Sequence, residues 1–448
     1  MPHTFHTNTT TRLQSWGHYP QLEPDAVVPA FWLSDLPDLA SFERPVLPFA
    51  YGRSYGDSCL NEGGVSLDVS YLKRFISFDP IEGLLRCEAG VSLADILQVV
   101  VPRGWFLPVS PGTKFVSVGG AIANDIHGKN HHRAGTFGCH VTCFELLRSD
   151  GRRLLCSPCE NRELFCATIA GLGLTGLILW AEFRLKPIVN PFIDMESIRF
   201  SSLDEFLQLS ADSDPNFEYT VAWVDCLRSG RSLGRGLFMR GNHNCSQAYS
   251  ARRIPAKLPL AIPFDLPSFI LNTLTVKAFN EVYYHKQISK VLGRVMSYES
   301  FFYPLDAIEQ WNRLYGKRGF LQYQCVVPFD NGGEVMKELL RRISRSGEGS
   351  FLAVLKTFGE VPSPGMLSFP RPGITLALDF SYHGKKTLQL CEELDGIVRQ
   401  SGGCVYPAKD ARMSSESFQT YFPQWREFEH CIDPKFSSSF WRRVVPAG

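Results

Sequence analysis

The stretch Pro111–His132 reads PGTKFVSVGGAIANDIHGKNHH, and the organisation of the chain follows outward from it. It opens on a Pro-Gly turn, passes the pair Gly119-Gly120 and ends in a polar, histidine-rich loop. Glycines let a backbone approach a flat or phosphorylated ligand and present bare N–H groups to it. A second such loop, Tyr51–Asp57 (YGRSYGD), follows the apolar run Val46–Ala50. Together the two loops predict one extended ligand that contacts both of them. The alternative is that they are two ordinary tight turns.

The size and composition of the chain predict a globular protein of two or more domains. Its 448 residues exceed one ordinary core, and 44% of them are hydrophobic and 20% charged. A net charge of +1, with no block of Lys or Arg, argues against nucleic acid as a partner. The 13 scattered cysteines indicate reduced thiols in a reducing compartment.

Neither a signal peptide nor a transmembrane segment is predicted. The first residues lack an apolar core, and no window reaches the ~18 uninterrupted apolar residues of a membrane span. We therefore expect a cytoplasmic protein, or one peripheral at the inner face of the membrane. The nearest apolar stretch, Ile254–Leu274, is broken by four prolines. It predicts either a surface loop or a mobile apolar lid that touches a membrane or a lipid substrate.

Hydrophobic patterning predicts alternating strands and helices after a polar lead-in with a short helix around Ser34–Glu43. Ser92 and Asp95 have the spacing of a capping box, and Gly104 closes that helix. Strands are expected at 46–52, 65–70, 84–90, Val141–Leu147, Leu177–Leu185, Phe192–Phe200, Tyr219–Cys226, Gly236–Met239, Phe320–Val327 and Ile374–Phe380. Further helices are expected at Glu160–Ile169, Val335–Ser344 and Lys386–Arg399.

Several familiar motifs are incomplete. Residues 171–176 (GLGLTG) match the dinucleotide-binding GxGxxG pattern, but a predicted helix precedes them and a strand follows. The Rossmann arrangement needs the opposite order, so we interpret them as a helix-to-strand turn packed under a ligand. The histidines at 127, 131, 132 and 140 lack a completing carboxylate, and Cys156 and Cys159 lack a second pair. No metal site is predicted.

The two glycine loops and the GLGLTG turn carry a family likeness. Residues 45–187 resemble the FAD-binding domain of the vanillyl-alcohol oxidase flavoprotein family. YGRSYGD is similar to its first pyrophosphate loop, Pro111–His132 to its second, and GLGLTGLI to the segment under the flavin. Over about residues 10–445 the likeness extends to a branch that oxidises a polyprenyl-phosphoryl ribose. The motifs DIHGKNHH (125–132) and AKDAR (408–412) carry it most specifically.

The resemblance implies an α+β fold. A two-lobed FAD-binding domain would occupy residues 1–187, completed by about 401–448, and an α+β substrate domain with an antiparallel sheet would occupy 188–400. The implied FAD contacts are Gly52, Arg53, Ser54, Tyr55, Gly56, Asp57, Ser58, Gly112, Ser117, Val118, Gly119, Gly120, Asn124, Asp125, Ile126, His127, Ile178 and Tyr406. The implied substrate pocket contains Trp223, Gln322, Gln324, Lys356 and Lys409.

Two positions depart from relatives. Many of them tether FAD through a histidine where Tyr55 stands here, so non-covalent FAD is implied. Ala377 replaces a cysteine that faces the flavin ring in actinobacterial relatives, which leaves the pocket shape and substrate open.

The implied reaction is FAD-dependent oxidation of a secondary hydroxyl, ribose C2′, of a polyprenyl-phosphoryl pentose to the keto sugar. This is the first half of an epimerisation to the arabinose form used in cell walls. Lys409 would orient or deprotonate the hydroxyl if burial or a positive neighbour such as Arg412 lowers its pKa, and His127 is the alternative base.

The implied partners are a lipid-linked sugar phosphate, a separate NAD(P)H-dependent keto-reductase subunit, and quinone or oxygen as electron acceptor, with a peripheral membrane contact. Two alternatives stay open: an oxidase of a soluble alditol or sugar lactone on the same fold, and a flavin-binding scaffold without turnover.

Overall fold

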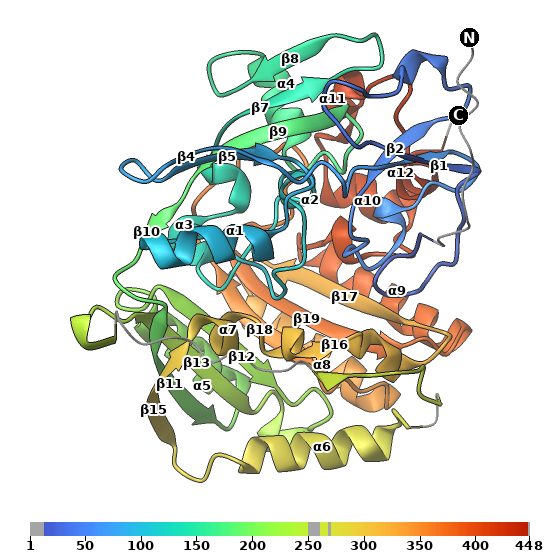
Figure 1. Ribbon diagram of the computed structural model, residues 1–448. Helices are drawn as coiled ribbons and strands as arrows, with labels where there is room; N and C mark the ends of the chain where they lie inside the picture. Colours follow the sequence, from blue (N-terminus) through green and yellow to red (C-terminus); the bar gives the residue numbers. More distant parts are fainter. Residues whose placement is uncertain (1–12, 250–259, 268–269, 447–448) are drawn as a thin grey trace.

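The computed structural model describes residues 13–249, 260–267 and 270–446. An upper lobe carries the N-terminal strands, and a lower lobe is built on one large sheet (Figure 1). Helices and mostly antiparallel sheets alternate in both lobes, which confirms the α+β expectation.

The upper lobe contains a parallel sheet and an antiparallel sheet. The parallel sheet has the order β1-β3-β2, with β1 Ala26–Pro29, β2 Val46–Phe49 and β3 Val65–Asp68. The antiparallel sheet has the order β4-β5-β9-β7-β8, with β4 Phe75–Asp79, β5 Leu84–Glu88, β9 Leu177–Arg184, β7 Val141–Leu147 and β8 Arg153–Cys156. A short pair, β6 Trp105–Phe106 and β10 Lys186–Pro187, lies beside them.

The helices of this lobe are short. They are α1 Leu93–Val100, α2 Val118–Ala123, α3 His131–Ala134 and α4 Arg162–Thr168. The capping box predicted for α1 is confirmed, because the Asp95 amide donates to Ser92 Oγ at 3.1 Å. Gly104 ends the following turn with a φ of 81°, a value that favours glycine.

The helix expected around Ser34–Glu43 is wrong. Only a single 3₁₀ turn forms there, Leu39–Ser41, with Asp38 accepting a hydrogen bond from the Ala40 amide. Pro37 explains the difference, because proline removes an amide donor and disfavours helical backbone at the preceding residue.

The lower lobe is built on an antiparallel sheet whose described strands run in the order β15-β11-β13-β12-β18-β19-β17-β20. Their bounds are β15 Val291–Ser297, β11 Phe192–Phe200, β13 Gly236–His243, β12 Tyr219–Val224, β18 Ala353–Phe358, β19 Gly373–Ser381, β17 Phe320–Val327 and β20 Cys404–Val405. The strands and long helices predicted from patterning in this region are confirmed within a few residues.

Helices cover one face of this sheet and leave the other face for a cavity. The covering helices are α5 Leu203–Ser213, α8 Gly332–Ser346 and α9 Lys385–Gln400. Along β17, Leu321, Tyr323 and Cys325 enter the core, whereas Gln322 and Gln324 line the cavity. This alternation is the ordinary consequence of strand geometry.

The proline-broken stretch Ile254–Leu274 is described only in part, because residues 254–259 and 268–269 lie outside the described residues. Its described part includes β14 Leu260–Ala261, which pairs in parallel with β16 Ile308–Glu309. Ile262 and Leu271 pack on a cluster around Trp311, while Phe264 is exposed. Helix α6, Thr273–His285, begins at the end of the stretch, and α7, Tyr298–Phe302, follows β15.

The C-terminal segment returns to the upper lobe. It forms α10 Ser415–Tyr421, α11 Trp425–Cys431 and α12 Ser439–Val444. The Val46 amide at the start of β2 donates to the Lys435 carbonyl at 2.7 Å, and α11 contacts α4. Figure 1 shows this red segment beside the blue N-terminal strands.

Candidate active site

The first glycine loop follows β2 and packs against the segment that carries Lys409. Gly52 has a φ of 57°, and a Cβ there would lie 2.3 Å from the Gln14 carbonyl oxygen. A Cβ at Gly56 would lie 1.7 Å from the Asp410 carbonyl oxygen. The Tyr55 amide donates to the Ala408 carbonyl at 3.0 Å. The glycines are therefore required by close backbone packing, which places this loop directly beside Lys409.

The second glycine loop, within Pro111–His132, is held by hydrogen bonds at both ends of α2. Ser117 caps α2 by accepting from the Gly120 amide at 3.1 Å, and the Gly119 amide donates to the Ala89 carbonyl at 2.8 Å. At the far end of α2, Tyr406 Oη donates to the Asn124 carbonyl at 2.6 Å. This bond joins the loop to the C-terminal segment.

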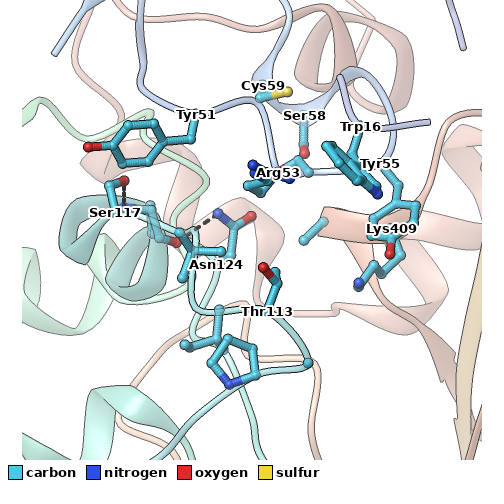
Figure 2. A pocket seen from close by; sticks show the side chains of 18 of the residues that line it. Trp16, Tyr51, Arg53, Tyr55, Ser58, Cys59, Thr113, Ser117, Asn124 and Lys409 are labelled. Carbon is cyan, nitrogen blue, oxygen red and sulfur yellow. Dashed lines mark hydrogen bonds between the residues drawn. The ribbon is translucent and has the colours of Figure 1, made fainter. Parts of the chain in front are cut away.

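One large cavity lies between these loops and the open face of the lower sheet. Tyr51, Arg53, Ser117, Asn124 and Lys409 surround it in Figure 2. Of the predicted residues, those that line the cavity are Gly52, Arg53, Ser54, Tyr55, Ser58, Gly112, Ser117, Gly119, Gly120, Asn124, Ile126, His127, Ile178, Tyr406, Gln322, Gln324, Lys356 and Lys409.

The residues that line the cavity are suited to FAD, because they include a glycine and buried polar atoms that lack a partner in the part of the chain that the structure describes. Gly112 lines the cavity, and a Cβ there would meet nothing within 4 Å. Arg53 Nε and Ser58 Oγ line the cavity and have no hydrogen-bond partner among the described residues. Buried polar atoms are normally paired, so these two are suited to a polar ligand. The Arg53 guanidinium lies 4.2 Å from the Trp16 ring centre, which holds it in place.

Both ring nitrogens of His127 are engaged by neighbouring side chains. Lys356 Nζ lies 2.9 Å from Nδ1, and Gln324 Nε2 lies 2.9 Å from Nε2. Burial, followed by the charge of Lys356, lowers the pKa of His127 well below its ordinary value. His127 is therefore neutral, and neither of its nitrogens is free for a substrate in this arrangement.

Three lysines, Lys129, Lys356 and Lys409, line the cavity without a carboxylate within 4 Å among the described residues. Burial lowers the pKa of Lys129 to about 8 and that of Lys356 well below its ordinary value. Buried cations are usually paired, because the loss of hydration is costly. These lysines therefore favour the binding of a negatively charged group in the cavity.

Lys409 differs from the other two lysines in its contacts. Its Nζ lies 3.9 Å from the centre of the Tyr55 ring and donates to no acceptor within the described parts of the chain. Burial lowers the pKa of Lys409 to about 8, and the charge of Asp379 opposes this shift. The amine is therefore partly neutral near pH 8 and open to the cavity.

Asp379 lies beside Gln322 on the same face of the large sheet, and its charge acts on Lys409. It is fully buried on β19 and accepts hydrogen bonds from Gln322 Nε2 at 2.6 Å and Tyr315 Oη at 3.3 Å. Burial raises the pKa of Asp379 to about 7. This carboxylate was not predicted, since nothing local in the sequence separates it from an ordinary strand residue.

Five predicted residues lie outside the cavity lining: Gly56, Asp57, Val118, Asp125 and Trp223. Asp57 forms an ion pair with Arg443 at 2.8 Å, and Asp125 accepts from the Gly138 amide at 2.9 Å. Val118 is fully buried, and Gly56 serves the packing described above. The Trp223 indole donates to the Phe351 carbonyl at 3.0 Å and packs against Tyr283. These residues support the cavity walls.

Arg412 is not the positive neighbour of Lys409 that its place in the sequence predicts. Its guanidinium donates to Asp395 at 2.9 Å and lies outside the cavity lining. The pKa of Lys409 is lowered by burial instead.

Several lining residues were not predicted from the sequence, among them Trp16, Tyr51, Cys59, Thr113 and Trp311. Trp16 and Trp311 reach the cavity from segments almost 300 residues apart, and neither was predicted to line it. The GLGLTG turn was expected to pack under a ligand, and Leu172, Gly173 and Gly176 do line the cavity.

Neither a metal-binding cluster nor a membrane-spanning helix occurs in the part of the chain that the structure describes. No group of three or more His, Cys, Asp or Glu side chains there is arranged to hold a metal ion. Among the described helices, none has the length and apolar character needed to cross a membrane.

Comparison with known proteins points in the same direction as the geometry. The family model described as "FAD binding domain" matches residues 36–157. The decaprenylphosphoryl-β-D-ribose oxidase of Mycolicibacterium smegmatis is 36% identical over 97% of this chain and 98% of its own length. A Streptomyces coelicolor protein described as uncharacterized is 33% identical over 79% of this chain and all of its own length. The human Δ(24)-sterol reductase is 31% identical over 26% of this chain.

Proposed function

Because the chain belongs to the family of FAD-dependent oxidoreductases that includes decaprenylphosphoryl-β-D-ribose oxidase, we propose that it oxidises the C2′ hydroxyl of a polyprenyl-phosphoryl ribose. The product is the 2′-keto sugar, and its reduction from the opposite face would complete an epimerisation to the arabinose form. The single observation that carries the proposal is a cavity that combines two glycine loops with three lysines. Among the described residues these lysines have no carboxylate within 4 Å, and the amine of Lys409 is open to the cavity.

Lys409 is the proton acceptor in this proposal. Oxidation of the alcohol removes a hydride from C2′ and a proton from its hydroxyl, and FAD supplies the hydride acceptor when bound. Lys409 has a pKa of about 8 and no protein acceptor for its amine among the described residues, so a neutral fraction can take the proton. His127 is the weaker candidate, because Lys356 and Gln324 engage both its nitrogens.

The polar floor of the cavity would orient the sugar. Gln322 and Gln324 project from β17, and Lys356 projects from β18 on the same face of the sheet. Gln322 is itself held by Asp379, and Gln324 lies against His127, so both amides are positioned before a ligand arrives. Fixed donors of this kind reduce the entropic cost of aligning a hydroxyl for reaction.

The charge of the cavity favours a phosphorylated substrate over a neutral one. Lys129 and Lys356 are buried and lack a carboxylate within 4 Å among the described residues. A phosphodiester would stabilise the protonated form of these lysines, whereas an alditol or a sugar lactone offers them no negative charge. This supports the lipid-linked phosphoryl sugar.

Ala377 leaves room beside the reacting centre. It lines the cavity on β19, between Gln324 of β17 and Val354 of β18. Neither the hydride nor the proton transfer needs a thiol at this position. The same proposal includes non-covalent FAD, with Tyr55 where relatives have a tethering histidine.

The remaining partners follow from the chemistry. A keto sugar must be reduced to complete an epimerisation, which calls for a separate NAD(P)H-dependent keto-reductase subunit. Reoxidation of FAD calls for quinone or oxygen. The lipid tail calls for a peripheral contact with the inner face of the membrane.

An anaerobic assay tests the function. The holoenzyme is mixed with polyprenyl-phosphoryl ribose, with an alditol or with a sugar lactone, and loss of flavin absorbance is followed. We expect rapid bleaching with the phosphoryl ribose only. Equal bleaching by the alditol or lactone would indicate an oxidase of soluble sugars, and no bleaching by any of the three would indicate a flavin-binding scaffold.

A further inference from the structure

The outward face of α6 carries large apolar side chains that no described element covers. Leu274 and Val282 are 78% and 72% exposed. With Ala278 they stand at every fourth position, so they share one face of the helix. Ile288, just beyond the helix, is 87% exposed. A monomer in water rarely leaves such a run of apolar side chains bare, so this face is suited to contact with something else.

The exposed apolar character continues onto β15. This strand forms one edge of the large sheet and pairs with β11 alone among the described strands. Val291 and Leu292 are 53% and 45% exposed. Edge strands are normally blunted or covered, because open edges invite association. Figure 1 shows α6 along the lower end of the molecule with β15 joined to it by a short turn.

Within residues 273–297, most charged residues are positive. Residues 273–297 contain a single acidic residue, Glu281, which is paired with Arg228 and Arg235. Lys277, Lys286 and Arg294 are exposed, and none of these three has a carboxylate within 4 Å in the described structure. Protein–protein interfaces are depleted in lysine, whereas membrane-surface helices combine apolar residues with Lys and Arg. The charge pattern therefore favours anionic lipid over a protein partner.

A seam of aromatic side chains connects the inner face of α6 to the cavity wall. Phe279 lies 5.7 Å from Phe351, and Tyr283 lies 4.7 Å from Trp223, between ring centres. Leu352, the residue after Phe351, lines the cavity. This aromatic layer is what lies between the helix and the cavity lining.

We propose that Leu274, Val282, Ile288, Leu292, Lys277 and Arg294, here named the α6–β15 surface, dock on the anionic surface of a lipid bilayer. Docking holds the cavity next to the membrane, so that a lipid-linked head group reaches the cavity while its tail stays in lipid. The delivery step rests on the proposed function, whereas the docking itself does not.

Vesicle co-sedimentation of the holoenzyme tests the docking. The probes are vesicles of phosphatidylcholine alone and of phosphatidylcholine with phosphatidylglycerol, at low and high salt. We expect binding to the anionic vesicles that weakens with salt. Leu274→Gln with Val282→Gln should reduce partitioning by roughly tenfold for each side chain. Lys277→Gln with Arg294→Gln should reduce it by roughly fivefold for each cation.

Matched controls use equally exposed residues elsewhere. Ile81 is 84% exposed in the upper lobe, and Lys73 and Lys385 are exposed away from this surface. Ile81→Gln and Lys73→Gln with Lys385→Gln should leave partitioning unchanged. Glutamine retains good helix propensity, so the α6 variants should fold. Equal loss in controls and α6–β15 variants, or no binding to anionic vesicles, would overturn the proposal.

Two further measurements distinguish lipid docking from self-association and from a failure of catalysis. Sedimentation velocity that shows a dimer dissolved by Leu274→Gln with Val282→Gln would make the surface an interface between copies and overturn lipid docking. Turnover should fall in that variant for a vesicle-embedded long-chain substrate and not for a short-chain soluble analogue. If neither substrate turns over in the wild type, the proposed function fails while the vesicle co-sedimentation still decides the docking.

Discussion

At the scale of single residues, the chemistry depends on which buried groups keep a free atom. His127 and Lys356 satisfy each other at 2.9 Å, and Asp379 is held by Gln322 and Tyr315. Lys409 lies against the Tyr55 ring and, within the described structure, retains its donors for the cavity. Lys409 is therefore a better candidate for the proton acceptor than His127, because its amine has no hydrogen-bond partner among the described residues whereas both nitrogens of His127 are engaged.

We expect Lys409→Ala to bind FAD normally and to lose turnover by a factor of at least ~100, the usual scale for a general acid–base group. The side chain touches the Tyr55 ring and the cavity but makes no protein hydrogen bond in the described structure, so folding should survive. Stopped-flow flavin reduction and the flavin-to-protein absorbance ratio measure the two effects. Reduction at the wild-type rate would remove Lys409 from the mechanism.

The pH dependence of flavin reduction follows from the same lysine. Lys409 acts as a base only when neutral, so the rate should rise with pH through its pKa of about 8 and level off above it. The Asp379 charge raises this pKa, so Asp379→Asn should move the midpoint to lower pH. Reduction rates of both proteins across the pH range test this, and an unchanged midpoint would disconnect Asp379 from Lys409.

The flavin should be released when the protein is precipitated with acid. Tyr55 stands where many relatives carry a tethering histidine, and its ring lies against Phe320 and Lys409. We expect all yellow colour in the supernatant, measured by absorbance after centrifugation. Colour retained in the pellet would show a covalent link.

At the scale of elements, each glycine loop is shaped by what it touches. Gly52 and Gly56 are needed because carbonyl oxygens would clash with a Cβ, whereas Gly112 lines the cavity and a Cβ there would meet nothing within 4 Å. Gly52 and Gly56 are therefore required for the fold, whereas we expect Gly112 to be required for binding FAD. Substitutions at these glycines can therefore distinguish an effect on the stability of the protein from an effect on its affinity for FAD.

Gly112→Ala should leave the unfolding free energy of the apoprotein within ~0.5 kcal/mol of wild type, because the added methyl meets nothing. It should weaken FAD at least tenfold, about 1.4 kcal/mol, since the methyl occupies the cradle. Denaturant unfolding and FAD titration give both numbers. As control, Gly396→Ala within α9 also meets nothing and should bind FAD normally while gaining about 0.5–1 kcal/mol. Unchanged FAD affinity in Gly112→Ala would place the cradle elsewhere.

At the scale of the whole molecule, the last described helix, α12, anchors the first glycine loop to the segment that carries Lys409. Arg443 of α12 donates to Asp57 in the first loop at 2.8 Å and to Asp410 beside Lys409 at 2.9 Å. Both carboxylates are buried, with side chains 4% and 2% exposed. One guanidinium therefore joins segments almost 400 residues apart in the chain.

Arg443→Met should lower the unfolding free energy by about 3 kcal/mol, because buried Asp57 loses its ion pair and buried Asp410 loses the nearer of its two cations. FAD should dissociate more readily, since the first loop loses its anchor. Thermal unfolding and flavin fluorescence on dilution report the two effects. Arg152→Met removes an ion pair whose side chains are 66% and 50% exposed, and it should change stability by less than ~1 kcal/mol. Equal effects in both variants would contradict the anchoring role.

The sequence by itself determined the α+β class, most strands and helices, the two glycine loops and, through family likeness, FAD as the cofactor. These features depend on residues that are close together in the sequence, because hydrophobic periodicity and the steric freedom of glycine act over a few residues. Only the tertiary structure paired Lys356 with His127, 229 positions away, and Arg412 with Asp395 rather than Lys409. Only it revealed the hydrogen bond between Gln322 and Asp379, and the apolar face of α6 that no described element covers. Burial and long-range charge set pKa values and exposed surfaces, and both depend on how distant segments pack.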